Sequence, residues 1–197
     1  KIPGSFAYVR RQETAGQGHA VWCARKLVGY DPVAVILADD LIKGSNTIKE
    51  MISNYNSGNM LAIMDVNNQD VSSYGIISPG KTLKNNMTEI LGLIEKPSID
   101  KAPSNMAVVG RYIIEPSVFK ELEKQNRGTS NEIQLTDAIA NRIGKSHCYG
   151  YKFTNDRFDC GSKLGFIQAN IKLSIERDDL SEKLKSWLKE EFLNGDV

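Results

Sequence analysis

The segment Val33-Ala34-Val35-Ile36-Leu37-Ala38, followed directly by Asp39 and Asp40, gives the strongest indication of the fold of this 197-residue chain. An unbroken apolar run of this length is typical of a strand buried on both faces, as in a parallel sheet packed between helices. We therefore predict a central strand over residues 33–38. Ligands of open α/β sheets bind outside the carboxyl ends of the strands, which is where the two acids fall. A bound Mg²⁺ would offset their mutual repulsion; capping of the following turn by both acids is the alternative.

The rest of the chain alternates between short apolar segments and amphipathic ones. We predict strands at 6–9, 60–66, 74–78, 89–95, 107–114 and 147–153. We predict helices at 19–27, 46–57, from Pro116, at 135–143 after a capping box of Thr129 and Glu132, and in a tail over about 163–194. Apolar stripes in the tail, from Leu164 to Ile175 and from Leu180 to Leu188, are expected to face the core. Such alternation implies an α/β sheet, and we expect residues 1–197 to form a single domain.

The composition of the chain limits which kinds of partner and which cellular compartment we expect. The formal net charge of +1 gives no reason to expect a nucleic-acid or membrane partner, and no apolar stretch approaches the length of a membrane span. Cys23, Cys148 and Cys160 are an odd, unclustered set without metal-ligand spacing. We therefore expect a cytoplasmic protein.

Three short segments could carry chemistry, and each has an ordinary structural explanation as well. In Gly16-Gln17-Gly18 the glycines would let a ligand approach the start of a helix, or they form a tight turn. In Glu95-Lys96-Pro97 the proline is expected to hold Lys96 extended, with its ammonium available to phosphate oxygens; a solvated pair is the alternative. Asp159 lies at a strand-to-helix junction, where it could bind a metal or cap the helix.

Seven segments taken in order resemble bacterial UTP–glucose-1-phosphate uridylyltransferases, the UDP-glucose pyrophosphorylases. The segments are GQGHAVWCAR, VAVILADDL, YGII, GLIEKP, APSNMAVVGRYI, NEIQLTDAI and RFDCGSKLGFIQANI. The likeness extends from Phe6 to about Asp179. It implies a nucleotidyltransferase-type, Rossmann-like mixed sheet flanked by helices. It further implies formation of UDP-glucose and pyrophosphate from UTP and glucose 1-phosphate, with Mg²⁺ as cofactor and self-association into a homo-oligomer.

The resemblance also implies roles for individual residues. Asp39 matches the catalytic carboxylate that holds Mg²⁺ against the phosphates, and Asp159 a second acid near the metal. Lys96 matches a catalytic lysine that reaches the phosphoryl oxygens. Positions expected to bind the substrates are Gly16 and Gly18 beside the uridine, and Gly75, Glu95, Val109 and Gly110 on the sugar side.

The chain departs from the family pattern in two ways. Nothing in it matches the glycine-rich G-x-G-T-R-type nucleotide loop, so we expect the amino-terminal βα unit to be missing and the isolated chain to turn over poorly. The position of the family's base-reading glutamine is occupied by Arg11, and a shift of one residue would bring Gln12 to the uracil.

Two other functions stay open at this point. The protein could use another nucleotide or sugar, for example dTTP, or form ADP-glucose. It could also be a catalytically silent paralogue that binds nucleotide sugars. The presence of Asp39, Glu95, Lys96 and Asp159 together argues against a silent protein, which would not need the whole set.

Overall fold

The computed structural model describes residues 6–128 and 131–192. The chain divides into two compact units. The large unit comprises Lys1–Leu37 and Asn46–Thr154, and the small unit comprises Ala38–Ser45 and Asn155–Val197. That the two together form one domain stays a prediction.

A six-stranded sheet forms the centre of the large unit, in the order β1-β6-β3-β7-β5-β4. β3 and β7 are parallel, whereas β1, β4 and β5 pair antiparallel with their neighbours. This mixed sheet confirms the predicted fold class. The strands are β1 (Val33–Ile36), β3 (Asn59–Asp65), β4 (Gly75–Thr82), β5 (Met87–Glu95), β6 (Met106–Ile114) and β7 (Cys148–Lys152).

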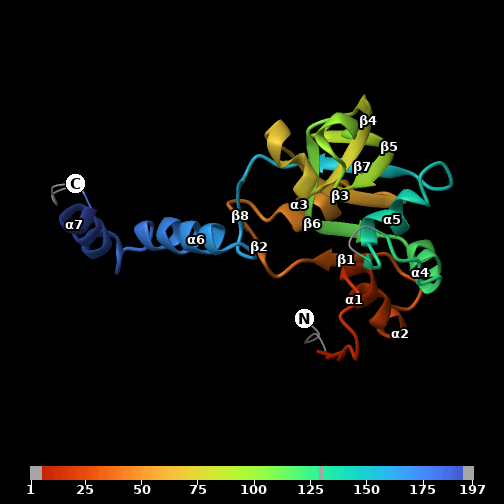
Figure 1. Cartoon of the computed structure of the whole chain (residues 1–197), viewed down its shortest axis with the longest axis horizontal. Helices are drawn as coiled ribbons and strands as arrows, with labels where there is room; N and C mark the ends of the chain where they lie inside the picture. The colour runs from red at the N-terminus through yellow and green to blue at the C-terminus, as the bar shows by residue number, and fades with distance from the viewer. Residues whose placement is uncertain (1–5, 129–130, 193–197) are drawn as a thin grey trace. The chain divides into compact units, whose positions relative to one another are not determined.

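Five helices accompany this sheet in the described part of the large unit. They are α1 (Gln17–Cys23), α2 (Arg25–Val28), α3 (Thr47–Asn54), α4 (Pro116–Glu123) and α5 (Leu135–Ala140), with 3₁₀ turns η1 (Asn68–Ser73) and η2 (Ile99–Lys101). Apolar residues of α1, α4 and α5 share one core with the sheet, and Figure 1 shows these helices grouped together. Pro116 begins α4 as predicted, because its fixed φ suits the first helical turn. Thr129, half of the predicted capping box, lies outside the described residues.

Strand β3 lies in the middle of the sheet, as its apolar sequence predicts. Leu61 and Ile63 belong to the core shared with α1, α4 and α5. Met60 and Ala62 alternate with them, so they face the other side, and they are equally buried. α3 packs against β3 and β6 with Met51 fully buried. A strand covered on both faces explains why no polar residue interrupts this segment between Met60 and Met64.

A strand forms within the predicted range 33–38, but the prediction that it is central is wrong. β1 ends at Ile36, lies at an edge of the described sheet and pairs with β6. Val33 and Val35 face the core, whereas Ile36 is 53% exposed. An apolar run reports hydrophobicity and not the number of strand partners, so the sequence could not distinguish an edge strand from a central one.

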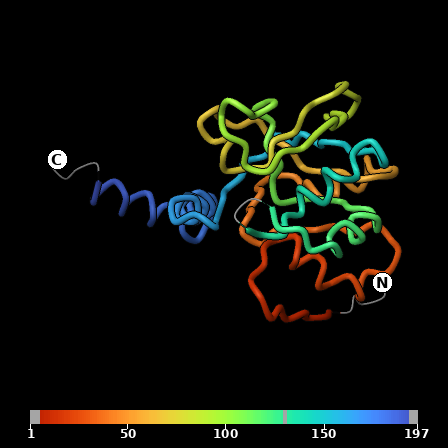
Figure 2. Tube along the Cα trace, turned by 45° about the vertical axis from the view of Figure 1, so that its right-hand side comes forward, coloured from red at the N-terminus to blue at the C-terminus, as the bar shows by residue number. Residues whose placement is uncertain are grey.

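The strand predicted at residues 6–9 is also absent from the structure. These residues are exposed and have no regular secondary structure. Figure 2 shows an extended stretch, in red, that leads into α1. Alternating apolar residues such as Phe6 and Tyr8 are compatible with a strand, but a strand also requires a neighbour that accepts its hydrogen bonds.

The small unit contains a two-stranded sheet and two helices. β2 (Asp40–Lys43) pairs antiparallel with β8 (Asp156–Asp159), and α6 (Lys163–Ile175) and α7 (Ser181–Phe192) follow. The side chains of Asp40 and Arg157 form a buried ion pair between the two strands. The Ser162 hydroxyl accepts a hydrogen bond from the Gly165 N–H at 3.0 Å and so caps α6.

The apolar stripes of the tail do not face a core in this structure, contrary to prediction. Leu164 is 66% exposed, and Ile167 and Trp187 are also exposed. The buried residues of α6 are the small ones, Gly165 and Ala169. A Cβ at Gly165 would lie 2.1 Å from the carbonyl oxygen of Asp159, so this helix approaches β8 through its small residues.

Among the residues that the structure describes, no helix has both the length and the apolar character needed to cross a bilayer.

The glycine after α3 provides a test of the fold. Gly58 has φ +77°, and a Cβ there would lie 2.2 Å from the carbonyl oxygen of His147. Gly144 has φ +83°, but an added Cβ would meet nothing within 4 Å. Gly144→Ala should therefore cost only the left-handed backbone penalty, about 1–2 kcal/mol. Gly58→Ala should cost about 1–3 kcal/mol more, measured by urea unfolding. Equal losses would show that the close approach at His147 is not a constraint.

Candidate functional site

A buried carboxylate, a hydroxyl and a glycine meet where β4 begins and β5 ends. Gly75 and Glu95 are register partners on these strands, and α5 packs against β5 and contributes Thr136. The Thr136 Oγ1 donates a hydrogen bond of 2.7 Å to Glu95 Oε2. A Cβ at Gly75 would lie 3.0 Å from Thr136 Cγ2 and 3.1 Å from Glu95 Oε2. The lack of a side chain at Gly75 therefore leaves the room in which this contact forms.

The environment of Glu95 shifts its ionisation in two opposing directions. Burial raises the pKa of Glu95 above its ordinary value, because the charged form loses hydration. The Thr136 hydrogen bond and the Lys96 charge oppose this shift, whereas the carboxylates of Asp137 and Glu132 add to it. The net shift is upward, so Glu95 binds its proton more tightly than an exposed carboxyl group does.

Lys96 adopts an unusual backbone conformation at the end of β5. Its φ is +46°, in the left-handed region, so the predicted extended conformation is wrong. Its N–H donates to the carbonyl oxygen of Tyr74 at 2.9 Å, and its Nζ lies 4.0 Å from Glu95 Oε1. The proline at 97 disfavours a helical backbone at Lys96 but does not enforce an extended one. A left-handed non-glycine residue is strained by about 1–2 kcal/mol, and such strain is concentrated at functional sites.

Gly16 and Gly18 serve a close approach within the protein itself. Gly16 precedes α1 with φ +93°, and Gly18 donates its N–H to the carbonyl oxygen of Ile133 at 2.8 Å. A Cβ at Gly18 would lie 2.6 Å from that oxygen. The side chain of Arg11 donates to the Gly16 carbonyl oxygen at 3.1 Å, while Gln12 is exposed. The glycines are thus explained by packing, and contact with a nucleotide stays a prediction for them and for Gln12.

Val109 and Gly110 lie on β6 and are buried. The carbonyl oxygen of Gly110 accepts hydrogen bonds from the N–H of Leu37 and from the Arg111 side chain, both at 2.9 Å. These bonds attach the residue after β1 to β6. A role for Val109 and Gly110 in sugar binding stays a prediction.

Asp39 and Asp159, although 120 positions apart in sequence, come together in the small unit. The N–H of Cys160 donates to the backbone oxygen of Asp39 at 2.8 Å. A Cβ at Gly161 would lie 3.1 Å from both Asp39 Oδ2 and Asp159 Oδ1. Asp159 Oδ1 also accepts the Gly161 N–H at 3.0 Å, which is the local turn contact that the capping alternative anticipated. Two carboxylates therefore converge over a glycine that leaves space beside them.

Two carboxylates are too few to hold a metal ion by protein ligands alone, but they fit Mg²⁺ that is also bound by a substrate. Within the described residues, no group of three or more His, Cys, Asp or Glu side chains is arranged to hold a metal ion. Mg²⁺ is usually bound by one or two carboxylates together with substrate phosphates and waters, because it gives up its hydration reluctantly. Asp40 is not available in the same way, since it is paired with Arg157.

Sequence reasoning missed two residues that hold these groups in place. Thr136 bonds to Glu95, and Arg157 pairs with Asp40. Thr136 lies within the segment QLTDAI and Arg157 within RFDCG, which both contributed to the family resemblance. The resemblance therefore marked the segments, but only the structure identifies the partner of each side chain.

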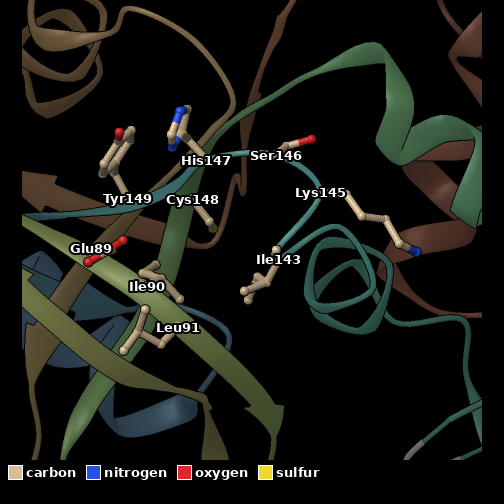
Figure 3. Close-up of a pocket in the computed structure, with 10 residues that line it drawn as sticks. Glu89, Ile90, Leu91, Ile143, Lys145, Ser146, His147, Cys148 and Tyr149 are labelled. Atoms are coloured by element: carbon tan, nitrogen blue, oxygen red, sulfur yellow. The ribbon is translucent and has the colours of Figure 1, made fainter.

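A separate cavity of about 380 Å³ lies between β5, β7 and the connection before β7 (Figure 3). None of the residues predicted for the site lines it. Burial raises the pKa of its Cys148 thiol to about 12, so this thiol is unreactive at neutral pH. The cavity is lined by Glu89, Ile90, Leu91, Ile143, Gly144, Lys145, Ser146, His147, Cys148 and Tyr149.

Comparison with known sequences yields relatives named UTP–glucose-1-phosphate uridylyltransferase. The chain is 42% identical over 190 residues to a UTP–glucose-1-phosphate uridylyltransferase of Komagataeibacter xylinus, covering 95% of this chain and 64% of the relative. It is 36% identical over 185 residues to UTP–glucose-1-phosphate uridylyltransferase 1 of Staphylococcus saprophyticus, covering 92% and 64%. The chain thus spans about 64% of the length of the curated relatives it matches.

Solved structures agree with the sequence relatives. A UDP-glucose pyrophosphorylase complexed with UDP-glucose matches with a TM-score of 0.83 at 40% identity, over 87% of this chain and 67% of that one. A UTP-bound UGPase of Acinetobacter baumannii matches with a TM-score of 0.79 at 36% identity, over 91% and 63%. The family model described as nucleotidyl transferase matches residues 3–175. With this match over most of its length, and with the mixed sheet and paired acids described above, the chain belongs to the nucleotidyl transferase family.

Proposed function

We propose that this protein forms UDP-glucose and pyrophosphate from UTP and glucose 1-phosphate, in a reversible reaction that requires Mg²⁺. The convergence of the Asp39 and Asp159 carboxylates at Gly161 is the observation that carries the proposal, because it supplies the acids that a phosphate-bound Mg²⁺ needs. The similarity to relatives named UTP–glucose-1-phosphate uridylyltransferase supports the choice of substrates.

The residues of this chain would position the groups and balance their charge. A phosphate oxygen of glucose 1-phosphate forms a bond to the α-phosphorus of UTP, and the bond from that phosphorus to pyrophosphate breaks. Bound Mg²⁺ would neutralise phosphate charge. Asp39 and Asp159 would hold it, and the Lys96 ammonium would pair with phosphoryl oxygens.

The remaining residues would bind the two substrates. Glu95 would accept a hydrogen bond from a sugar hydroxyl. Gly75, Val109 and Gly110 would border the sugar, and Gly16, Gly18 and Gln12 the uridine.

Two further proposals concern the compartment and the assembly of the protein. Cys23, Cys148 and Cys160 are free thiols, which fits the reducing cytoplasm. We also propose self-association, to which the exposed apolar residues Leu164, Ile167 and Trp187 could contribute.

The substrate assignment is tested by titrating the protein with UDP-glucose, UDP, ADP-glucose and dTDP-glucose in the presence of Mg²⁺, using isothermal titration calorimetry. We expect UDP-glucose to bind at least tenfold more tightly than ADP-glucose and more tightly than UDP. A pyrophosphate-release assay with each of the four nucleotides and glucose 1-phosphate then tests catalysis, and we expect the isolated chain to turn over poorly in it. Preference for another nucleotide sugar would contradict the assignment.

Asp39 and Asp40 form a matched pair of adjacent acids for testing the metal site. Asp39→Asn should abolish the strengthening of UDP-glucose binding by Mg²⁺, because one of two converging carboxylates is lost. The melting temperature should change little, since Asp39 is exposed. Asp40→Asn should instead destabilise the fold by about 3–5 kcal/mol, because it leaves Arg157 without its buried counter-ion. An unchanged Mg²⁺ response in Asp39→Asn would remove Asp39 from the site.

Two substitutions of Lys96 should have the same effect on binding but different effects on stability. Lys96→Ala and Lys96→Gly should each weaken UDP-glucose binding about tenfold, because the phosphoryl oxygens lose a cationic partner. In urea unfolding, the free energy of unfolding of Lys96→Gly should exceed that of Lys96→Ala by about 1 kcal/mol, since glycine adopts φ +46° without strain. The exposed Lys101→Ala makes the same change in net charge and should leave binding unaltered. Equal weakening in Lys101→Ala would indicate a general charge effect.

A further inference from the structure

The hydrogen bond between Thr136 and Glu95 gives the two oxygens of the Glu95 carboxylate different surroundings. Thr136 is 6% exposed and the Glu95 side chain 10%, so water has little access to either. The Thr136 hydroxyl donates to Oε2, whereas Oε1 is the oxygen at 4.0 Å from Lys96 Nζ. An ionised carboxylate can only accept hydrogen bonds, so Oε2 has its donor within the protein.

We propose that Thr136 is a positioning residue for sugar recognition, which holds Glu95 by Oε2 and so presents Oε1 to a hydroxyl donor of the substrate. The inference rests on the proposed function, in which Glu95 faces the sugar. Thr136 acts through Glu95 and makes no contact with the substrate itself.

The backbone around the pair is built to fix its geometry. Thr136 is in the first turn of α5, and Gly75 on β4 leaves just enough room for the threonine methyl and the carboxylate. A Cβ at Gly75 would lie 3.0 Å from the Thr136 methyl group, so a side chain at that position would crowd the threonine. In this arrangement the Thr136 hydroxyl points at Oε2, with 2.7 Å between the two oxygens.

The hydroxyl also favours the ionised, hydrogen-bond-accepting form of Glu95, because its hydrogen bond lowers the pKa. The charged groups that act on Glu95 are Lys96, which favours the ionised carboxylate, and Asp137 and Glu132, which oppose it together with burial. Without the Thr136 hydrogen bond, the pKa of Glu95 rises further. A protonated Glu95 presents a donor where an acceptor is required, so sugar recognition is lost as the pH falls through the raised pKa.

Three variants distinguish the effect of the Thr136 hydroxyl from the effects of side-chain shape and of position. Thr136→Val removes the hydroxyl and keeps the shape, and Thr136→Ser keeps the hydroxyl. Thr88→Val removes a hydroxyl from β5 at a position that is also 6% exposed but lies outside the site. Circular dichroism and thermal melting establish that each variant is folded.

Binding of UDP-glucose and of UDP is measured for each variant by calorimetry at pH 7. We expect Thr136→Val to weaken UDP-glucose binding about tenfold and to leave UDP binding unchanged, a loss typical of a hydrogen bond to a charged group. Thr136→Ser should come within about threefold of the original protein, and Thr88→Val should bind both ligands as before. Equal losses for UDP-glucose and UDP, failure of serine to rescue, or the same loss in Thr88→Val would overturn the proposal.

A ligand-free measurement keeps this inference separable from the proposed function. The carboxyl ¹³C resonance of Glu95, assigned with Glu95→Gln, is titrated with pH in each protein. Its pKa should be higher in Thr136→Val and nearly unchanged in Thr136→Ser and Thr88→Val. An unchanged pKa in Thr136→Val would overturn the positioning role. If the original protein binds UDP-glucose no better than UDP, the proposed function fails, while the titration still decides whether Thr136 controls Glu95.

Discussion

The close approach of α5 to the β4–β5 pair is the constraint on which the candidate sugar site depends. It is possible because Gly75 has no side chain where Thr136 and Glu95 meet. Any Cβ at that position would compete for the space that the hydroxyl and carboxylate share. The hydrogen bond of 2.7 Å follows from this packing, and it opposes the rise in the pKa of Glu95 that burial causes. A missing side chain at Gly75 thus makes room for a contact that influences the pKa of Glu95.

A second packing constraint governs the acids of the small unit. The ion pair of Asp40 with Arg157 joins β2 to β8, and in that register Asp40 lies opposite Asp159. A slip of one residue would turn every side chain of either strand to the other face. The adjacent acids therefore have different partners: Asp40 pairs with Arg157, whereas the carboxylates of Asp39 and Asp159 both lie beside Gly161. Removing one member of a buried ion pair is costly, because the other charge is left uncompensated.

The sequence predicted where strands and helices lie along the chain better than it predicted which partners they pack against. Strand β3 and helix α4 lie where apolar runs and Pro116 placed them, because such signals are local. The edge position of β1 and the exposure of Leu164 could not be predicted, since both depend on which partners a segment finds. The same holds for the site. The acids at strand ends were evident, but the Thr136–Glu95 bond and the positive φ of Lys96 require coordinates.

Burial of Glu95 and strain at Lys96 acquire a common explanation if the site recognises a sugar phosphate. In a poorly hydrated site a hydrogen bond is stronger, and an unpaired acceptor is correspondingly costly. With Oε2 committed to Thr136, Oε1 is the oxygen that a bound sugar would have to satisfy. A ligand without the matching hydroxyl would leave that oxygen unpaired, so it would be rejected more strongly than one that merely adds bulk. Lys96 stays close enough to Oε1 to help keep the carboxylate charged, and its exposed ammonium can still reach a phosphate. If the proposed roles hold, the strained lysine and the glutamate would act together, because the cation that would bind phosphate also favours the ionised carboxylate that would accept a hydrogen bond from the sugar.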